Sequence, residues 1–242
     1  MTDQRLVLLS GWGLGSAPLQ PLADALGVRL QVQVQVQVQI EPLPELDHAS
    51  VALWLDQLDE RLPDKAWLGG WSLGGMLASL LAARRGSACP GLLTLASNPC
   101  FVARETWPTA MAASTFRIFR DSYQQSPSAT LKRFAMLCSQ GAVDARSLSR
   151  SLTATAGGVD SLAGLDLLAT LDTQEALQRF SGPQLHVFAD ADALVPVSAA
   201  AAVQALQPDA TVHCMSGASH ALVLEQVADV AALLSRFMEA RA

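Results

Sequence analysis

One short segment limits what this chain can fold into. Residues 67–76 read WLGGWSLGGM, where an apolar run is followed by glycines around a single serine and then by a segment rich in alanine and leucine. The apolar run is typical of a buried strand, and the segment that follows is typical of a helix. A strand that turns directly into a helix at a Gly-x-Ser-x-Gly sequence indicates an α/β fold, with Ser72 on the turn.

Further apolar runs have the length and composition of strands. They read RLVLL at 5–9, GLLTLAS at 91–97 and QLHVFAD at 184–190, with helix-patterned segments between several of them. This alternation predicts βαβ units and a mostly parallel sheet flanked by helices. With 242 residues, half of them hydrophobic, the chain can bury one large core. We expect that core to consist of residues 1–101 and 182–242.

The run QVQVQVQVQI at 31–40 alternates strictly between valine and glutamine. A period of two predicts a strand with Val on one face and Gln on the other. A strand with one polar face belongs at or near the edge of a sheet, and the prolines of the following EPLPEL end it. We interpret the run as a structural strand and not as a binding motif.

Residues 102–181 have a different pattern, with helices and polar loops and no obvious strand. Ser126 and Pro127 are typical of a helix start, and Asp144 can cap the next helix. We predict a helical lid, inserted between the two halves of the core. Residues 102–150 hold seven basic and three acidic side chains, whereas the whole chain has a net charge of −6.

Composition excludes several classes of protein. Only 16% of residues are charged and the balance is acidic, which argues against a nucleic-acid binder and against a disordered chain. The apolar run near the N-terminus is too short for a secretory signal, and no stretch is long enough to span a membrane, so we expect a cytoplasmic protein. Four cysteines lack metal-ligand spacing and predict free thiols, with neither disulfides nor a metal site: Cys89, Cys100, Cys138 and Cys214.

A serine becomes a nucleophile when a base, usually histidine, takes its proton. Of the four histidines, His186 and His213 lie in strand-like runs, where an inward or half-buried structural role is expected, and His48 lies in a polar loop without a motif. His220 lies in the small-residue loop SGASHA, after an apolar strand and before the C-terminal helix. His220 is therefore the candidate base.

The carboxylate that orients the base has two candidates in VFADADALVP. Asp192 starts the loop that leads into LVP and is the better one, while Asp190 remains an alternative. The chain order Ser, Asp, His is that of the α/β-hydrolases. In that fold the oxyanion is held by the N–H after the nucleophile, here Leu73, and by one from the loop after the first core strand, here Trp12 in SGWGLG.

From about residue 5 onward the chain resembles a known family. The segments that carry the resemblance are LVLLSGWGLG, WLGGWSLGG, NPCFVARETWP, LKRF, DAR, DALVP and ASHA. They are similar to those of the pimeloyl-[acyl-carrier protein] methyl ester esterases of biotin synthesis. The resemblance implies an α/β-hydrolase that hydrolyses the methyl ester of a pimeloyl chain bound to acyl carrier protein and releases methanol. The chemistry of such an esterase calls for no metal or other cofactor, and we expect no nucleic-acid or membrane partner and a monomer.

The resemblance also assigns roles to residues. Ser72, Asp192 and His220 match the catalytic triad, and Trp12 and Leu73 match the oxyanion positions. The segment expected to line the acyl channel comprises Phe134, Ala135, Met136, Leu137 and Cys138. The residues expected to receive the acidic carrier protein are Arg133, Arg146 and Arg150. Two positions depart from the family: Ser10 replaces a histidine and Ala129 replaces a lid arginine.

Two alternative functions remain open from the sequence. One is a general short-chain carboxylesterase with the same fold and no carrier protein in its substrate. The other is a non-catalytic acyl-binding module with a degenerate triad. Dependence of activity on the carrier separates the first, and labelling of Ser72 by a fluorophosphonate probe separates the second.

Overall fold

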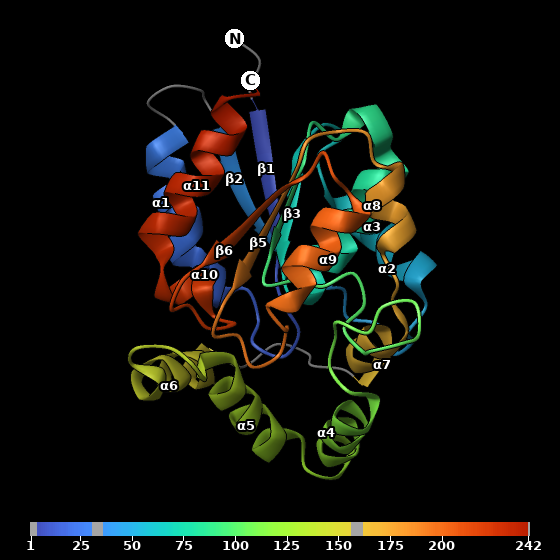
Figure 1. The fold of residues 1–242 in the computed structure, drawn as a ribbon, viewed down its shortest axis with the longest axis vertical. Coiled ribbons are helices and arrows are strands. Elements are labelled where there is room, and N and C mark those ends of the chain that lie inside the picture. Colours follow the sequence, from blue (N-terminus) through green and yellow to red (C-terminus); the bar gives the residue numbers. More distant parts are fainter. Residues whose placement is uncertain (1–3, 31–35, 156–161, 242) are drawn as a thin grey trace.

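The computed structural model of the chain describes residues 4–30, 36–155 and 162–241. Within these ranges, six strands form one sheet in the order β2-β1-β3-β4-β5-β6, and every neighbouring pair is parallel. The predicted α/β fold with a parallel sheet is confirmed (Figure 1). The strands are β1 (Gln4–Leu9), β2 (Val36–Glu41), β3 (Trp67–Trp71), β4 (Leu92–Leu95), β5 (Gln184–Ala189) and β6 (Thr211–Met215).

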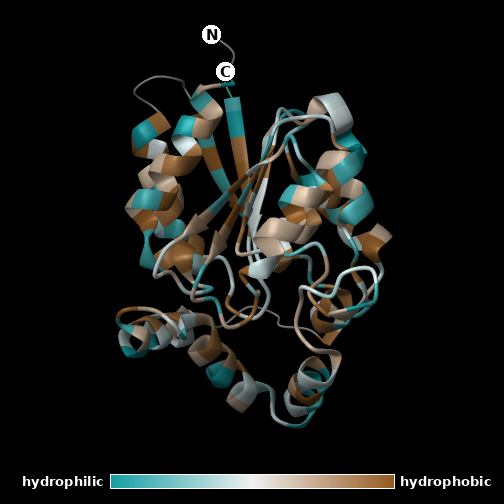
Figure 2. Cartoon of the chain, viewed as in Figure 1, coloured by the Kyte–Doolittle hydropathy of each residue, from teal (hydrophilic) through white to brown (hydrophobic). Residues whose placement is uncertain are grey.

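Helices cover both faces of the sheet. On one face, α1 (Gln20–Leu30) packs against α11 (Val227–Glu239). The other face is covered by α2 (Val51–Arg61), α3 (Leu73–Arg85), α8 (Gln174–Arg179) and α9 (Ser198–Leu206). Because both faces are covered, β3, β4 and β5 are buried along their whole length. Figure 2 shows apolar residues on the central strands and on the helix faces turned toward them.

The two edge strands bear on two predictions. β2 lies at one edge, with Val36 buried and Gln37 and Gln39 exposed, which confirms the prediction for the described part of the Val–Gln run. Residues 31–35 of that run lie outside the described residues. β6 lies at the other edge and leaves His213 exposed. The prediction of an inward or half-buried His213 was wrong, because an edge strand has a neighbour on one side only.

Helices α4 to α7, which we call the insertion helices, follow β4 in the chain and lie beyond the carboxyl ends of the strands (Figure 1). Their bounds are α4 (Ala113–Gln125), α5 (Pro127–Ser139), α6 (Ala145–Thr155) and α7 (Leu162–Thr170). Asp144 Oδ1 caps α6 by accepting a hydrogen bond from Ser147 N at 3.0 Å. Ser126 precedes α5, but its side chain makes no capping hydrogen bond, because its backbone also ends α4.

Three short helices complete the described chain: η1 (Ala17–Leu19), η2 (Gly86–Ala88) and α10 (Leu222–Glu225). None of the described helices is long and apolar enough to cross a membrane.

Candidate active site

Ser72 occupies a strained turn between β3 and α3. Its φ of 54° and ψ of −119° lie in a region that L-residues rarely adopt. The end of β4 holds this turn in place: Ser72 N donates to Leu95 O at 2.9 Å, and Ser97 Oγ donates to Ser72 O at 2.8 Å. Backbone strain persists only where the surroundings fix it, and here hydrogen bonds do so on both sides of the serine.

The glycines around Ser72 are required by close packing. A Cβ atom on Gly70 would lie 2.2 Å from the carbonyl carbon of Gly74, and one on Gly74 would lie 2.3 Å from Leu9 O. Neither distance is possible for real atoms. The turn therefore packs against the end of β1, and the start of α3 lies at the carboxyl ends of the strands.

His220 and Asp192 form a buried pair. His220 Nδ1 lies 2.8 Å from Asp192 Oδ2, and the two side chains are 0% and 1% exposed. The other oxygen of Asp192 accepts hydrogen bonds from Leu194 N at 2.7 Å and Val195 N at 2.9 Å. One carboxylate oxygen of Asp192 is thus bound by its own loop, and the other binds the imidazole of His220.

Asp190, the alternative acid, has other partners. Its carboxylate accepts hydrogen bonds from Ser216 Oγ at 3.0 Å and Gly217 N at 2.7 Å. These contacts brace the turn after β6. The geometry therefore favours Asp192 as the partner of His220.

The second ring nitrogen of His220 faces no protein partner. Nε2 is buried, and among the described residues it has no hydrogen-bond partner. When Nδ1 donates to Asp192, the neutral ring leaves Nε2 with a lone pair. A buried basic nitrogen in this state is suited to accept a proton from a serine hydroxyl.

Trp71 links the base to the nucleophile turn. Its Nε1 donates to the carbonyl oxygen of His220 at 2.9 Å, and its ring centroid lies 5.7 Å from that of the imidazole. On another side of this indole lies Gly11, where a Cβ atom would come within 3.1 Å of the ring. Since Trp71 directly precedes Ser72, the base, the nucleophile turn and the loop after β1 meet around one side chain.

The predicted oxyanion donors lie on two sides of this junction. Leu73 N is at the start of α3, and no hydrogen bond within the described chain uses it. The N-terminus of a helix carries a partial positive charge suited to a developing anion. Trp12 follows β1, and its buried ring makes edge-to-face contacts with Phe119, Tyr123 and Phe134 of α4 and α5. The oxyanion role of both residues stays a prediction.

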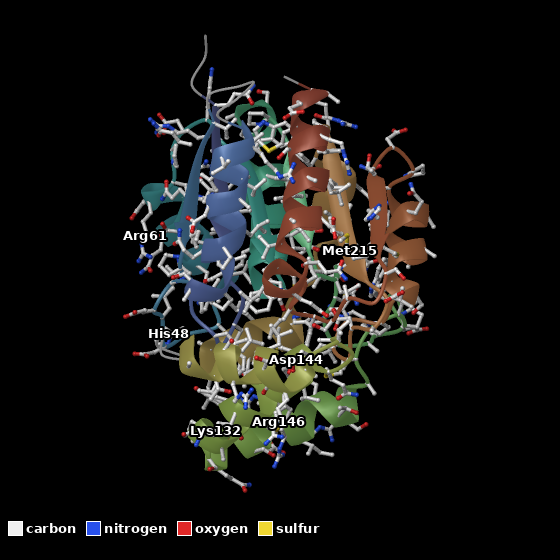
Figure 3. The ribbon with its side chains drawn as sticks, turned by 90° about the vertical axis from the view of Figure 1, so that its left-hand side faces the viewer. His48, Arg61, Lys132, Asp144, Arg146 and Met215 are labelled. Carbon is white, nitrogen blue, oxygen red and sulfur yellow. The ribbon has the colours of Figure 1, made fainter. Side chains whose placement is uncertain are left out.

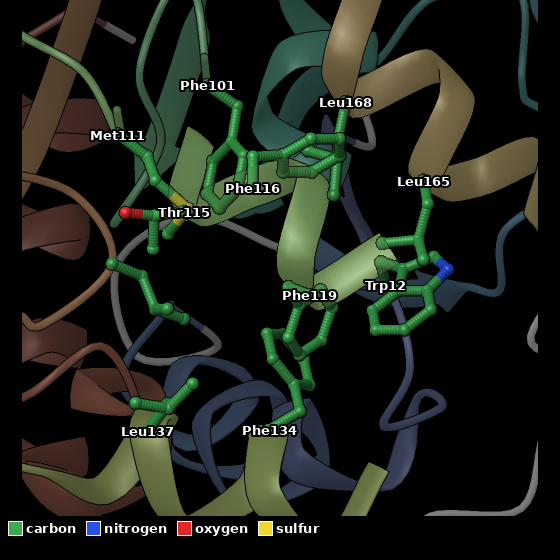
Figure 4. A pocket seen from close by; sticks show the side chains of 11 residues that line it. Trp12, Phe101, Met111, Thr115, Phe116, Phe119, Phe134, Leu137, Leu165 and Leu168 are labelled. Carbon is green, nitrogen blue, oxygen red and sulfur yellow. The ribbon is translucent and has the colours of Figure 1, made fainter. Parts of the chain in front are cut away.

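An apolar pocket lies between the insertion helices and the core (Figure 4). Its free volume is about 50 Å³, smaller than the roughly 300–1,000 Å³ of sites that enclose a whole small ligand. Thr115 is the one lining residue with a polar side chain apart from the Trp12 indole. The lining residues are Trp12, Phe101, Met111, Thr115, Phe116, Phe119, Phe134, Leu137, Leu165, Leu168 and Leu194.

The predicted acyl-channel segment divides between two faces of α5. Phe134 and Leu137, three residues apart, line the pocket. Ala135 and Cys138 are buried beside it, where burial raises the pKa of the Cys138 thiol, and Met136 is 56% exposed. A continuous run on a helix cannot face one cavity, because the helix turns by about 100° per residue. The substrate-binding role of all five residues stays a prediction.

The predicted docking arginines are exposed. Arg133 lies on α5, Arg146 and Arg150 lie on α6, and none forms an ion pair with another described residue. Lys132 is also exposed, and Figure 3 shows Lys132 and Arg146 on the insertion helices, away from the sheet. Leu152 of α6, by contrast, is fully buried.

Sequence analysis missed several residues of this site. Ser97 and Trp71 hold the Ser72 turn and the His220 loop, but their hydrogen-bond partners lie 25 and 149 residues away in the chain. Phe116 and Phe119 had a weak signal, since their spacing of three suits one face of a helix. Elsewhere, the four cysteines are free, with Cys214 exposed and the others buried. Within the described ranges, no three His, Cys, Asp or Glu side chains could hold a metal ion together.

The sequence matches known proteins along nearly its whole length. A family model described as the alpha/beta hydrolase fold matches residues 38–227. The pimeloyl-[acyl-carrier protein] methyl ester esterase of Aromatoleum aromaticum is 34% identical over 97% of this chain and 98% of its own length. The protein of that name from Yersinia pseudotuberculosis is 30% identical over 98% of this chain and 94% of its own. The biotin biosynthesis bifunctional protein BioHC of Cellvibrio japonicus is 36% identical over 99% of this chain, which spans 48% of that relative.

Solved structures with the same fold are more distant in sequence. A bromoperoxidase from Bacillus anthracis superposes with a TM-score of 0.84 at 19% identity, covering 98% of this chain and 92% of its own. An esterase from Exiguobacterium antarcticum gives 0.79 at 15% identity over the same shares. At these identities the likeness shows the fold alone. The sequence matches reach further: the chain belongs to the α/β-hydrolase family and, within it, to the family of the pimeloyl-[acyl-carrier protein] methyl ester esterases.

Proposed function

We propose that this chain is a serine esterase of biotin synthesis that hydrolyses the methyl ester of a pimeloyl chain bound to acyl carrier protein. The observation that carries the proposal is the buried His220–Asp192 pair beside the strained Ser72 turn. It occurs in a chain that spans 98% of an esterase of that name from Aromatoleum aromaticum. The pair supports ester hydrolysis as the reaction, and the likeness to that relative supports the choice of substrate.

In the first half of the reaction, His220 Nε2 takes the proton of Ser72 Oγ as this oxygen attacks the ester carbonyl carbon. Asp192 stabilises the imidazolium that forms, and its buried 2.8 Å contact fixes the orientation of the ring. The tetrahedral intermediate then collapses. The bond to the methoxy oxygen breaks, His220 gives its proton to that oxygen, and methanol leaves.

In the second half, water attacks the acyl group on Ser72. His220 removes a proton from this water and returns it to Ser72 Oγ when the acyl bond breaks. The products are the free carboxylate end of the pimeloyl chain and the restored serine. In both halves the carbonyl oxygen becomes an anion, and the N–H groups of Trp12 and Leu73 are the proposed donors to it.

The insertion helices would act as a lid that selects the substrate. The pocket wall, with Phe116, Phe119 and Phe134 among its residues, suits a methylene chain, whose burial is worth about 0.8 kcal/mol per CH₂. The exposed cations on α5 and α6 would attract an acidic carrier protein. Such attraction mainly raises the association rate and is screened by salt.

The test is hydrolysis of the carrier-bound methyl ester by the purified protein. Mass spectrometry of the carrier should show loss of one methyl group, with methanol released in equal amount. The expected result is a higher kcat/KM for the carrier-bound ester than for free dimethyl pimelate. Equal efficiency on both esters would favour a general carboxylesterase, and complementation of a biotin auxotroph that lacks this esterase would test the role in the cell.

A further inference from the structure

Glu225, on the short helix α10, binds the loop that carries His220. Its Oε2 accepts hydrogen bonds from Ser219 N at 2.9 Å and from Ser219 Oγ at 2.8 Å. The same hydroxyl accepts a hydrogen bond from Ala221 N at 3.3 Å. Ser219 is thus bound to the carboxylate directly and Ala221 is linked to it through the Ser219 hydroxyl, whereas Glu225 is not among the residues that line the apolar pocket.

The other oxygen of Glu225 reaches the turn between α5 and α6. Oε1 accepts a hydrogen bond from Val143 N at 3.3 Å. The last turn of α5 contacts the same loop directly, because Ala221 N donates to Cys138 O at 3.1 Å. One hydrogen bond therefore connects the insertion helices to Glu225, and a second connects them to Ala221 beside His220.

The α5–α6 turn also packs closely against the loop that carries Asp192. Gly141 has a φ of +96°, and a Cβ atom on it would lie 2.3 Å from Ala191 O. Ala191 directly precedes Asp192. The turn at 140–144 thus contacts the Asp192 loop directly and the His220 loop through Glu225.

We propose that Glu225 is a positioning residue, which together with the α5–α6 turn holds the loops of Asp192 and His220 at their 2.8 Å separation. The inference rests on the catalytic role of His220 proposed above. Charged hydrogen bonds are stronger than neutral ones, and this carboxylate accepts three. Without them, Ser219 loses both hydrogen bonds to the carboxylate, and the loop around His220 is held on that side only by the bond from Ala221 N to Cys138 O. The imidazole then samples more orientations.

The first experiment replaces Glu225 by alanine and follows hydrolysis of p-nitrophenyl acetate, which needs no carrier protein. Loss of orientation should lower kcat by about ten- to a hundredfold and change KM by less than about twofold. The matched control is Glu175→Ala, which removes a carboxylate that is 82% exposed on α8 and should change neither constant. Glu225→Gln keeps one oxygen acceptor and should fall between the wild type and Glu225→Ala.

A spectroscopic measurement separates positioning from loss of stability. The proton between His220 Nδ1 and Asp192 should give a resolved downfield proton resonance in the folded wild type. In folded Glu225→Ala this resonance should broaden or disappear, and in Glu175→Ala it should not change. A lower kcat with an unchanged resonance would overturn the proposal, and so would an unchanged kcat.

Two further variants test the route of the effect. If Glu225 acts through Ser219, the double variant Glu225→Ala with Ser219→Ala should be no slower than Glu225→Ala alone, whereas multiplied losses would contradict that route. Gly141→Ala should also lower kcat, because its Cβ displaces the Asp192 loop. Its control is Gly86→Ala, at a glycine that also has a positive φ, +54°, but open space around it. Equal kcat values for the two glycine variants would remove the turn from the proposal.

These outcomes are independent of the physiological substrate. A wild type that hydrolyses p-nitrophenyl acetate but not the carrier-bound ester would contradict the proposed function and leave the role of Glu225 testable. A wild type without either activity, and without reaction of Ser72 with a fluorophosphonate, would contradict both.

Discussion

The functional polar groups of the sheet core and of the insertion helices differ in burial and in hydrogen bonding. In the core, Ser72, His220 and the side chain of Asp192 are buried and held by hydrogen bonds from neighbouring strands and loops. On the insertion helices, Arg133 and Arg146 are exposed and without ion pairs among the described residues. Fixed groups suit bond making, whereas solvated charges suit encounter with a partner. The difference predicts that variants of the buried core groups lose turnover on every ester and that variants of the exposed insertion arginines lose it on one class.

The largest expected effect is that of Ser72→Ala. Removing the nucleophile should lower kcat by about 10⁴-fold or more, on carrier-bound and small esters alike. The variant should fold normally, because the hydroxyl makes no hydrogen bond that holds the turn among the described residues. Activity assays with both substrates and circular dichroism test this. Retention of a tenth of wild-type activity would transfer the nucleophile role elsewhere.

The second largest effect on turnover is expected for Asp192→Asn. The amide keeps the shape of the carboxylate but removes the charge that stabilises the imidazolium, so kcat should fall by roughly 10³- to 10⁴-fold. Asp190→Asn is the control, because Asp190 binds Ser216 and Gly217 and should affect turnover far less. If the two variants ranked the other way in steady-state kinetics, Asp190 would be the acid.

The core should also lose stability in acid through a residue remote from catalysis. His186 is buried against Thr94 and Gln184, and desolvation lowers its pKa from 6.5 to about 4. Below pH 6.5 the unfolded chain binds a proton that the folded chain does not. The contribution of His186 is therefore complete above pH 6.5 and is lost as the pH falls toward 4, by an amount on the order of 3 kcal/mol.

Urea unfolding at several pH values measures this contribution. His186→Gln should be less stable at neutral pH but should lose less of its free energy of unfolding between pH 6.5 and 4 than the wild type does. The same decline in both proteins would show that other groups cause the acid sensitivity.

The smallest expected effect is on the insertion helices. Changing Arg133, Arg146 and Arg150 together to Glu should lower kcat/KM for the carrier-bound ester by at least about tenfold at low salt and flatten its dependence on ionic strength. Hydrolysis of p-nitrophenyl acetate should change by less than about twofold.

The control for this variant makes the same charge change elsewhere. Arg29, Arg179 and Arg236 are exposed on α1, α8 and α11, and their replacement by Glu should leave selectivity for the carrier unchanged. Equal losses from both triple variants would indicate a general effect of net charge. Equal losses on both substrates would indicate a damaged insertion.

The fold was predictable because its signals are local. The apolar runs, the glycines around Ser72 and the capping residue Asp144 each specify structure within a few residues. The exposure of His213 was not predictable, because it depends on which strand lies at the edge of the sheet. Nor could spacing show which residues of 134–138 face the pocket, since that depends on the rotation of α5 against α4.

The residues of the candidate site that follow from chain order were predictable. Ser72, Asp192 and His220 follow strands in an order that the fold makes meaningful, and the structure brings the last two into contact. Ser97 and Glu225 carry no such signal. Ser97 is 25 residues from Ser72, and Glu225 is 82 residues from Val143, so their contacts exist only once the strands and helices are packed.

The placement of Trp12 has a consequence for engineering chimeras of this family. Its backbone belongs to the core, while its ring is enclosed by Phe119, Tyr123 and Phe134, and a Cβ atom on Gly164 of α7 would lie 2.5 Å from the indole. The insertion helices are therefore not an exchangeable cassette that can be grafted at its two ends. A transplant that omits a small residue at position 164, or the aromatic residues around the indole, would displace Trp12, the proposed oxyanion donor, along with changing the specificity.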